Sequence, residues 1–172
     1  MLERVVVPLD GSRLAQTALD YALKVLGGSG EIVLVTVLQQ PDVPIYDFYP
    51  VTVTPQAKNF ELTFNETVGR AQDYLKRLAD EIQAQYPYQV NTIVEAGDPA
   101  TVIVDTADKL NADAVVMSTH GRSGLSRWLF GSVTQKVLAV CCCPVFVIPS
   151  RVCEDAKKTS ELRAAEPTPS PN

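Results

Sequence analysis

Residues 115–134 read VVMSTHGRSGLSRWLFGSVT, and this stretch decides how the rest of the chain is interpreted. Its first residues predict the end of a buried strand, and the glycines, serines and threonine that follow predict a loop. Ser132 is expected to cap the helix that the pattern from Val133 onward indicates. A loop of this kind between a parallel strand and a helix N-terminus presents backbone N–H groups that suit a phosphate. The stretch therefore predicts a nucleotide site.

The overall composition is that of an ordinary soluble globular chain. Its 172 residues fit one domain that buries roughly two thirds of the surface exposed on unfolding. Hydrophobic residues make up 46% and charged residues 20%. A net charge of −5 and a pI near 4.9 argue against binding along a nucleic-acid backbone. We therefore expect local groups, rather than a basic surface, to hold an anionic ligand.

The N-terminal segment and the apolar runs bear on the expected location. Residues 1–5 read MLERV and lead directly into a strand-like run, without the pattern of a secretory signal. The longest apolar runs, such as 32–35 and 145–148, are far shorter than the roughly 20 residues that span a bilayer. We expect a cytoplasmic protein without a membrane segment.

Three of the four cysteines are consecutive. They are Cys141, Cys142, Cys143 and, separately, Cys153. Adjacent cysteines lack the spacing of a CxxC zinc site, and in a cytosolic chain we expect reduced thiols. Beside Leu138 and Val140 they are expected to pack as small hydrophobes, with a redox or metal role as the alternative.

Five apolar runs predict β-strands, and helical patterns separate them. The runs are residues 4–8, 31–38, 91–96, 114–118 and 144–148. The long run 31–38 is nearly continuous rather than alternating, which is typical of a strand buried on both faces of a parallel sheet. The alternation of strand and helix predicts an α/β fold with an open, five-stranded parallel sheet and helices on both faces.

The helical patterns carry their own start and stop signals. Residues 12–26 are amphipathic, with Ser12 as the cap and a Gly-Gly pair at 27–28 as the end. A long amphipathic helix is expected within 55–86, with apolar positions at 60, 64, 68, 71, 75, 78, 79 and 82. Asp98 and Pro99 open the next helix as a capping acid and a first-turn proline.

Two segments do not fit the alternation of strands and helices. Residues 39–57 are rich in proline and contain Tyr46, Phe48 and Tyr49, so we expect an irregular loop over one edge of the domain. Residues 150–172 lack hydrophobic periodicity and are expected to form a flexible C-terminal tail. The expected organisation is one domain over residues 1–149, followed by that tail.

Ligands of open parallel sheets bind beyond the carboxyl ends of the strands, so the residues that follow each strand are candidates. These are residues 9–12, 38–39, 96–99 and 118–132. Neither a GxxxxGK[ST] phosphate loop nor a GxGxxG dinucleotide fingerprint occurs in the chain. The expected site therefore differs from those of the phosphate-loop and dinucleotide folds.

Residues 4–148 resemble the universal stress protein family. Its nucleotide-binding members carry a glycine, two residues, a second glycine, nine residues and then Gly-Ser or Gly-Thr. Gly121 and Gly131-Ser132 match the second and third elements, and Ser118 stands in place of the first glycine. The run THGRSGL at 119–125 resembles the ATP-binding branch, and PLDGS at 8–12 and AGDP at 96–99 are similar to further family features.

The resemblance implies the strand order 3-2-1-4-5 and ATP, AMP or a related adenine nucleotide at the switch point between the first and fourth strands. The site residues that it implies are Pro8, Leu9, Asp10, Val37, Leu38, Gly97, Met117, Thr119, His120, Gly121, Arg122, Gly124, Gly131, Ser132, Val133 and Thr134. The backbone of Val37 and Leu38 would meet the adenine edge, and the 121–133 stretch would surround the phosphates.

Several of these residues have a plain structural alternative. Asp10 would face the ribose and phosphates directly or through Mg²⁺, and the alternative is that it only caps the first helix. Val7, Pro8 and Met117 would form apolar walls, although for Val7 and Met117 simple core packing is an equal alternative. The chain has a single histidine, His120, and the sequence indicates neither paired carboxylates nor a catalytic triad. Efficient catalysis therefore has little support.

The resemblance also implies a homodimer, in which the apolar edge formed by the fifth strand pairs with its symmetry mate. That edge consists of Val145, Phe146, Val147 and Ile148. The expected protein is an ATP-binding stress-response module that is not an enzyme, with hydrolysis slow or absent, whose bound state is read by a protein partner. The alternatives are a slow Mg²⁺-dependent ATPase that uses Asp10 and a nucleotide-free homodimeric scaffold.

Overall fold

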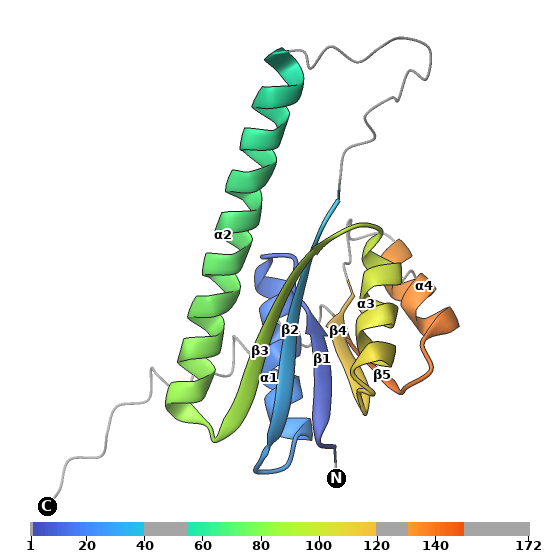
Figure 1. Ribbon diagram of the computed structural model, residues 1–172. Coiled ribbons are helices and arrows are strands. Elements are labelled where there is room, and N and C mark those ends of the chain that lie inside the picture. The colour runs from blue at the N-terminus through green and yellow to red at the C-terminus, as the bar shows by residue number, and fades with distance from the viewer. Residues whose placement is uncertain (1, 40–54, 120–130, 150–172) are drawn as a thin grey trace, which may run out of the picture.

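A computed structural model describes residues 2–39, 55–119 and 131–149, with backbone only for residues 55–62 (Figure 1). Strands and helices alternate along the chain, as the sequence predicts. The elements are β1 (Arg4–Pro8), α1 (Arg13–Val25), β2 (Gly30–Leu38), α2 (Pro55–Gln85), β3 (Tyr88–Ala96), α3 (Pro99–Lys109), β4 (Ala114–Ser118), α4 (Ser132–Val140) and β5 (Val145–Ile148).

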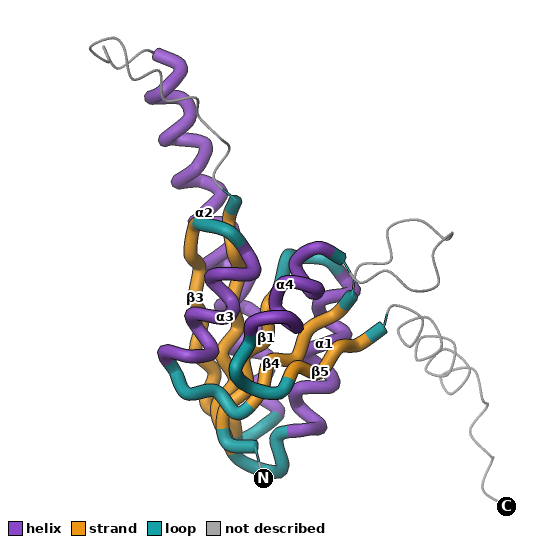
Figure 2. Tube along the Cα trace, turned by 90° about the vertical axis from the view of Figure 1, so that its right-hand side faces the viewer, coloured by secondary structure: helices purple, strands orange, loops and turns teal. Residues whose placement is uncertain are grey.

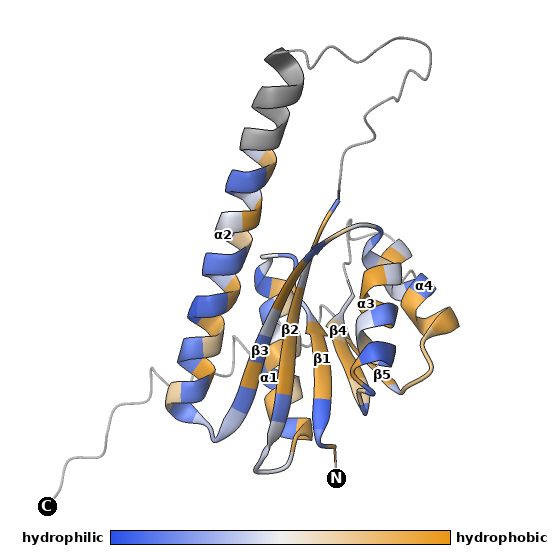
Figure 3. Ribbon diagram, viewed as in Figure 1, coloured by the Kyte–Doolittle hydropathy of each residue, from blue (hydrophilic) through white to orange (hydrophobic). Residues whose placement is uncertain are grey.

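The five strands form one parallel sheet in the order β3-β2-β1-β4-β5, so the predicted fold and strand order are confirmed. Helices α1 and α2 cover one face and α3 and α4 the other (Figures 1 and 2). Val5 and Val7 pack toward α1, whereas Val6 packs toward α3. Because both faces of the central strands are covered, these strands are apolar at successive positions, as Figure 3 shows.

Two predicted helix caps are confirmed. The Ser12 hydroxyl accepts a hydrogen bond from the backbone N–H of Ala15 at 3.1 Å and begins α1. The Asp98 carboxylate accepts from the backbone N–H of Thr101 at 3.1 Å, and Pro99 occupies the first turn of α3. That backbone hydrogen bond, together with one from the Thr101 hydroxyl, lowers the pKa of Asp98.

The start of α4 corrects the prediction that Ser132 is the cap. Gly131 occupies the N-cap position with extended backbone angles, and its carbonyl accepts from the N–H of Gln135 at 3.0 Å. No side chain of the described residues completes this cap. The helix therefore begins one residue earlier than predicted, because glycine takes the extended conformation that an N-cap needs. Ser132 is instead the first helical residue, with an exposed side chain.

Two other boundaries also differ from the prediction. Strand β3 begins at Tyr88, three residues before the predicted start at Asn91. Tyr88 pairs with Gly30, and the Tyr88 hydroxyl donates to the carbonyl of Leu23 at 3.0 Å. Residues 55–57, expected in the irregular loop, already belong to α2. Residues 40–54 and the predicted tail at 150–172 lie outside the described residues.

Helix α2 is longer than the sheet that it covers. Its 31 residues span about 46 Å, whereas a nine-residue strand such as β3 spans about 30 Å. Among its described side chains, which begin at Thr63, the buried ones are Leu75, Ala79 and Ile82, all in its C-terminal half. The other half projects past the carboxyl ends of the strands (Figures 1 and 2). Despite this length, no described helix is both long and apolar enough to cross a membrane.

Strand β5 lies at one edge of the sheet beside apolar residues that are exposed. Phe146 on β5 is 39% exposed, and Leu138 and Val140 near the end of α4 are 42% and 61% exposed. Exposed apolar side chains next to a sheet edge are suited to contact with another chain. The expected pairing of this edge with a second copy stays a prediction.

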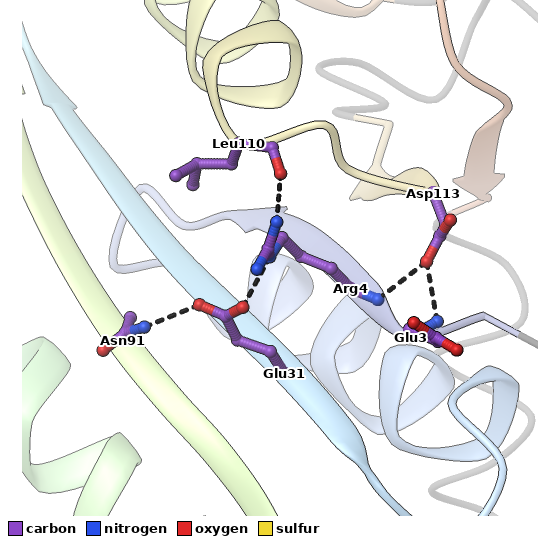
Figure 4. A network of polar contacts seen from close by, with 6 residues as sticks. All are labelled: Glu3, Arg4, Glu31, Asn91, Leu110 and Asp113. Atoms are coloured by element: carbon purple, nitrogen blue, oxygen red, sulfur yellow. Dashed lines mark hydrogen bonds and ion pairs between the residues drawn. The ribbon is translucent and has the colours of Figure 1, made fainter.

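A polar network ties the amino ends of the strands together (Figure 4). The Arg4 guanidinium donates to the carboxylate of Glu31 and to the carbonyl of Leu110. Glu31 also accepts from the Asn91 amide at 2.6 Å. The Asp113 carboxylate accepts from the backbone N–H of Arg4 at 2.8 Å. The network joins β1, β2, β3 and the α3–β4 connection at the end of the sheet opposite the strand ends that α2 overhangs.

We expect Glu31→Gln to lower the free energy of unfolding at pH 7 by about 1 kcal/mol, because the amide loses the ion pair with Arg4. Partial burial opposes ionisation of Glu31, but the hydrogen bonds from Arg4 and Asn91 and the charge on Arg4 outweigh it, so the pKa of Glu31 is lowered. A lowered pKa stabilises the fold above the ordinary carboxyl range, and this stability is lost as pH falls through the folded-state pKa.

Urea unfolding at pH 7 and at about pH 3, below the ordinary glutamate pKa of about 4.3, checks this prediction. The difference between the wild type and Glu31→Gln should shrink at the lower pH. Glu66→Gln is the matched control, because the Glu66 side chain is 67% exposed and its pair with Arg70 spans 3.4 Å on the surface of α2. An equal loss in both variants at pH 7 would contradict a specific role for the network.

Candidate functional site

A cavity of about 810 Å³ lies at the carboxyl ends of β1, β2 and β4. The chain leaves β1 toward α1 on one face and leaves β4 toward α4 on the other, so a crevice opens between them. Its lining residues are Pro8, Leu9, Asp10, Ala15, Val35, Val37, Leu38, Gln39, Thr63, Phe64, Thr67, Pro99, Ile103, Met117, Ser118, Gly131, Ser132, Val133 and Thr134. The volume is within the range of small-molecule sites.

The cavity brings together most of the described residues that the sequence indicates. Those on its wall are Pro8, Leu9, Asp10, Val37, Leu38, Met117, Gly131, Ser132, Val133 and Thr134. Four further candidates, His120, Gly121, Arg122 and Gly124, lie outside the described residues. Residues from three strand ends and the start of α4 thus share one cavity, although they are far apart in the chain.

Two predicted residues, Gly97 and Thr119, do not line the cavity. The Gly97 N–H donates to the carbonyl of Leu38 at 3.0 Å, which holds the β3–α3 turn against the end of β2. The Thr119 N–H donates to the carbonyl of Ile148 at 3.0 Å, which extends the pairing of β4 with β5. Val7 is fully buried among core residues, whereas Met117 is buried in the core and also reaches the wall.

Asp10 lies in the turn that leads into α1. Its carboxylate accepts a hydrogen bond from the N–H of Ser12 at 2.9 Å, across Gly11, whose φ of +79° suits glycine. Because Ser12 caps the helix, Asp10 does not supply the cap but orients the turn before it. The residue is exposed at the cavity wall, where its carboxylate can face a ligand.

The end of β2 offers one backbone edge to the cavity. The carbonyl of Val35 accepts from the N–H of Leu9 at 2.7 Å, so it points toward β1. The N–H and C=O groups of successive residues point to alternate sides of a strand. Those of Val37 therefore point toward the β1 side, as those of Val35 do, but they lie beyond the last pair of β1 with β2. The Leu38 carbonyl points toward β3, where it accepts from Gly97. Val37 is thus the residue whose backbone faces the crevice.

The N-terminus of α4 forms the opposite side of the cavity. Gly131, Ser132, Val133 and Thr134 all line it, and the first N–H groups of a helix lack partners within the helix. They also carry the positive end of the helix dipole, which attracts anions. No lysine or arginine occurs among the described lining residues. Within the described wall, backbone N–H groups are therefore the groups best suited to an anion.

The side chains of the wall are mostly apolar. Besides the carboxylate of Asp10, the described polar groups are an amide and the hydroxyls of serines and threonines, and no histidine or cysteine is among them. General acid–base catalysis needs a group that can exchange a proton with the reacting atom, and nucleophilic catalysis needs an activated nucleophile. On the described wall Asp10 is the only side chain that can exchange a proton in this way, and no activated nucleophile lies beside it.

Sequence reasoning included Pro99 among the candidates that follow β3, but it missed the contribution of α2 and of Ile103 in α3. Thr63, Phe64 and Thr67 of α2 reach the cavity from one face of the sheet, and Pro99 and Ile103 of α3 reach it from the other. The signal was present in the apolar pattern of α2, which continues at Phe64 beyond the length that the strands can cover. Phe64 and Ile103 consequently flank the end of β2.

A comparison with family models identifies the family to which this chain belongs. The family model for universal stress proteins matches residues 1–149. The chain belongs to the universal stress protein family. Universal stress protein MJ0531 of Methanocaldococcus jannaschii is 29% identical over 153 residues, which cover 86% of this chain and 82% of that protein. The solved structure of protein MJ0577 has a TM-score of 0.70 at 23% identity and covers 87% of this chain and 96% of its own.

Two further structures of the same fold were solved with adenine nucleotides. One is a universal stress protein in complex with cAMP, with a TM-score of 0.59, 22% identity and coverage of 86% of this chain and 97% of that chain. The other is the Arabidopsis thaliana protein At3g01520 with AMP bound, with a TM-score of 0.59, 18% identity and coverage of 88% and 94%. At this identity, both likenesses show the fold alone.

Proposed function

We propose that this universal stress protein binds an adenine nucleotide, ATP or AMP, in the cavity and acts as a stress-response module with slow or absent hydrolysis. The observation that carries the proposal is that the backbone edge of Val37 and the N-terminus of α4 open into one cavity. The first can pair with a base, and the second can hold phosphates. The relatives solved with cAMP and AMP support this choice of ligand.

The geometry suggests how the nucleotide would lie. The base would place its hydrogen-bonding edge on Val37, between Phe64 and Ile103, with Met117 as a further apolar contact. The phosphates would lie at the start of α4, and the ribose between these two ends, near Asp10. A planar apolar base thereby meets apolar side chains, and the anionic end meets N–H groups.

A magnesium ion fits this site only together with the phosphates. Mg²⁺ takes oxygen ligands in octahedral geometry and is commonly bound by one or two carboxylates plus phosphate oxygens and water. Asp10 supplies one carboxylate at the cavity wall. The described residues contain no group of three potential metal ligands. Asp10 would thus hold the ion jointly with the nucleotide, whose phosphate charge the ion would offset.

Calorimetric titration with ATP, AMP, cAMP and GTP tests the proposal. We expect the adenine nucleotides to bind at least tenfold more tightly than GTP, because guanine presents a reversed donor and acceptor pattern to the Val37 backbone. Nucleotide that co-purifies with the protein can be identified by chromatography. A folded protein without measurable affinity for any adenine nucleotide would overturn the proposal. It would favour the nucleotide-free scaffold, which is supported by the exposed apolar residues beside β5.

The same preparation distinguishes binding from enzymatic turnover. We expect phosphate release from ATP to remain at the buffer rate in the presence of Mg²⁺, because Asp10 is the only titratable side chain on the described wall and no second acid or base stands beside it there. Sustained release that disappears in Asp10→Ala would establish the ATPase alternative instead. Asp105→Ala is the matched control, since Asp105 is an exposed aspartate on α3 and does not line the cavity.

A further inference from the structure

A pair of cysteine thiols lies outside the proposed nucleotide site, at the other end of α4. Cys141 ends the helix, and its N–H donates to the carbonyl of Val137 at 2.9 Å. The chain then bends, and Cys143 follows just before β5. The Sγ atoms of Cys141 and Cys143 are 3.5 Å apart, and both residues pack against the core between the sheet and α3 and α4. Cys142, between them, is exposed.

We propose that Cys141 and Cys143 form a dithiol site that chelates a trivalent arsenical of the type R–As=O. Both thiols are half-buried, so a reagent can reach them from the surface. The proposal is independent of nucleotide binding, because neither cysteine lines the cavity.

The separation of the sulfur atoms favours chelation of one soft centre. Two thiolates bound at about 2.3 Å to one tetrahedral ion lie about 3.8 Å apart, close to the 3.5 Å between Cys141 and Cys143. A disulfide requires a sulfur separation of about 2.05 Å, so the two atoms would first have to approach by about 1.5 Å. The pair is therefore already spaced for two bonds to one thiophilic atom.

The number of ligands favours a centre that brings its own third substituent. A structural zinc ion needs four ligands, and the described residues contain no group of three cysteine, histidine or acidic side chains that could hold a metal. Monosubstituted trivalent arsenic needs only two protein sulfurs, because its organic group occupies the remaining position. The two half-buried thiols are sufficient for such a centre.

The protonation state of the thiols also favours a trivalent arsenical over a metal cation. Burial raises the pKa of Cys143 to about 12, with the hydrogen bond to Cys141 and nearby charge, including that of Asp108, acting in the same direction. The negative end of the α4 dipole also disfavours a thiolate at this end of the helix. Reactions that require a stable thiolate pair, such as binding a dication, are therefore disfavoured.

Condensation with an arsenical keeps the product uncharged. Two As–S bonds form, the As=O bond breaks, and its oxygen leaves as water together with the two thiol protons. Arsenic remains trivalent, so neither an oxidant nor a reductant is needed. The neutral product suits a half-buried site beside apolar core residues.

Phenylarsine oxide is the probe, added to the full chain and followed by intact-mass spectrometry and by the loss of titratable thiols. We expect one adduct per chain and the loss of two thiols, with the adduct persisting in excess glutathione. Cys141→Ser and Cys143→Ser should each weaken retention at least about 100-fold, because the second As–S bond forms at high effective concentration. Cys142→Ser is the matched control and should retain the adduct as the wild type does.

A second measurement uses the unmodified chain, so that a folding defect in a variant cannot decide the question. After the probe is bound, iodoacetamide labelling and peptide mapping should find Cys142 labelled and Cys141 and Cys143 protected. Undiminished retention in Cys141→Ser or Cys143→Ser, or protection of Cys142 or Cys153 in place of either member of the pair, would overturn the proposal.

Discussion

Replacing Gly131 by aspartate is expected to weaken adenine-nucleotide binding at least about 100-fold, or about 2.7 kcal/mol, without destabilising the fold. Gly131 lines the cavity at the N-cap of α4, where the proposed phosphates would lie. A carboxylate there would repel the phosphates and compete for the helix N–H groups that they need. The loss should be larger for ATP than for AMP, because ATP places more negative charge near this end.

The fold should tolerate this change because the position suits an aspartate. Gly131 has φ −60° and ψ 157°, and a Cβ added there would meet no heavy atom within 4 Å. Glycine at the N-cap supplies no side-chain cap to α4, and aspartate is among the best N-cap residues, so we expect a gain of about 0.5 kcal/mol in stability. The variant should therefore change stability and affinity in opposite directions.

Gly131→Asn is the matched control, since asparagine has nearly the same size and is an equally good N-cap without the charge. Calorimetric titration with ATP and AMP, combined with urea unfolding, measures both effects. We expect the asparagine variant to lose much less affinity than the aspartate variant. Affinity unchanged in Gly131→Asp would mean that the phosphates do not lie at the start of α4.

Gly30→Ala is expected to lower the free energy of unfolding by about 4 kcal/mol and the melting temperature by about 10 °C. Gly30 has φ +156°, and a Cβ there would lie 2.8 Å from the carbonyl oxygen of Glu3 and 2.7 Å from Cδ2 of Leu26. That carbonyl accepts from the N–H of Glu31 at 2.8 Å, and Leu26 is fully buried, so neither neighbour can move easily. Backbone strain and steric overlap each contribute about 1–3 kcal/mol.

Gly28→Ala measures the backbone strain of a positive φ without the steric overlap of the added Cβ. Gly28 has φ +62° in the same turn, but a Cβ added there would meet nothing within 4 Å. Alanine at this position should therefore cost only about 1 kcal/mol, from the left-handed backbone. Urea unfolding of both variants makes the comparison, and equal losses would contradict the close contact at Gly30. Nucleotide affinity should be unchanged in both, because this turn lies at the opposite end of the sheet from the cavity.

Much of the fold could be predicted because its signals are local. The caps at Ser12 and Asp98 act within three residues of the chain, and their residue types identify them without tertiary contacts. The continuous apolar runs report burial on both faces of a sheet. The errors lay at element boundaries: a glycine took the N-cap position expected for Ser132, and Tyr88 extended β3 through long-range pairing and burial that its sequence neighbours do not reveal.

The sequence by itself determined the alternation of strands and helices, their approximate bounds and the family, because these depend on residue types at short spacing. Only the tertiary structure decided that the backbone of Val37 faces the cavity while the Leu38 carbonyl is bonded to Gly97. That difference depends on the register of β2 against strands distant in the chain. The apolar pattern of α2 already included Phe64, but only the tertiary structure shows that this residue lies past the strand ends and reaches the cavity. The direction of a backbone N–H or C=O group depends on strand register and not on residue type.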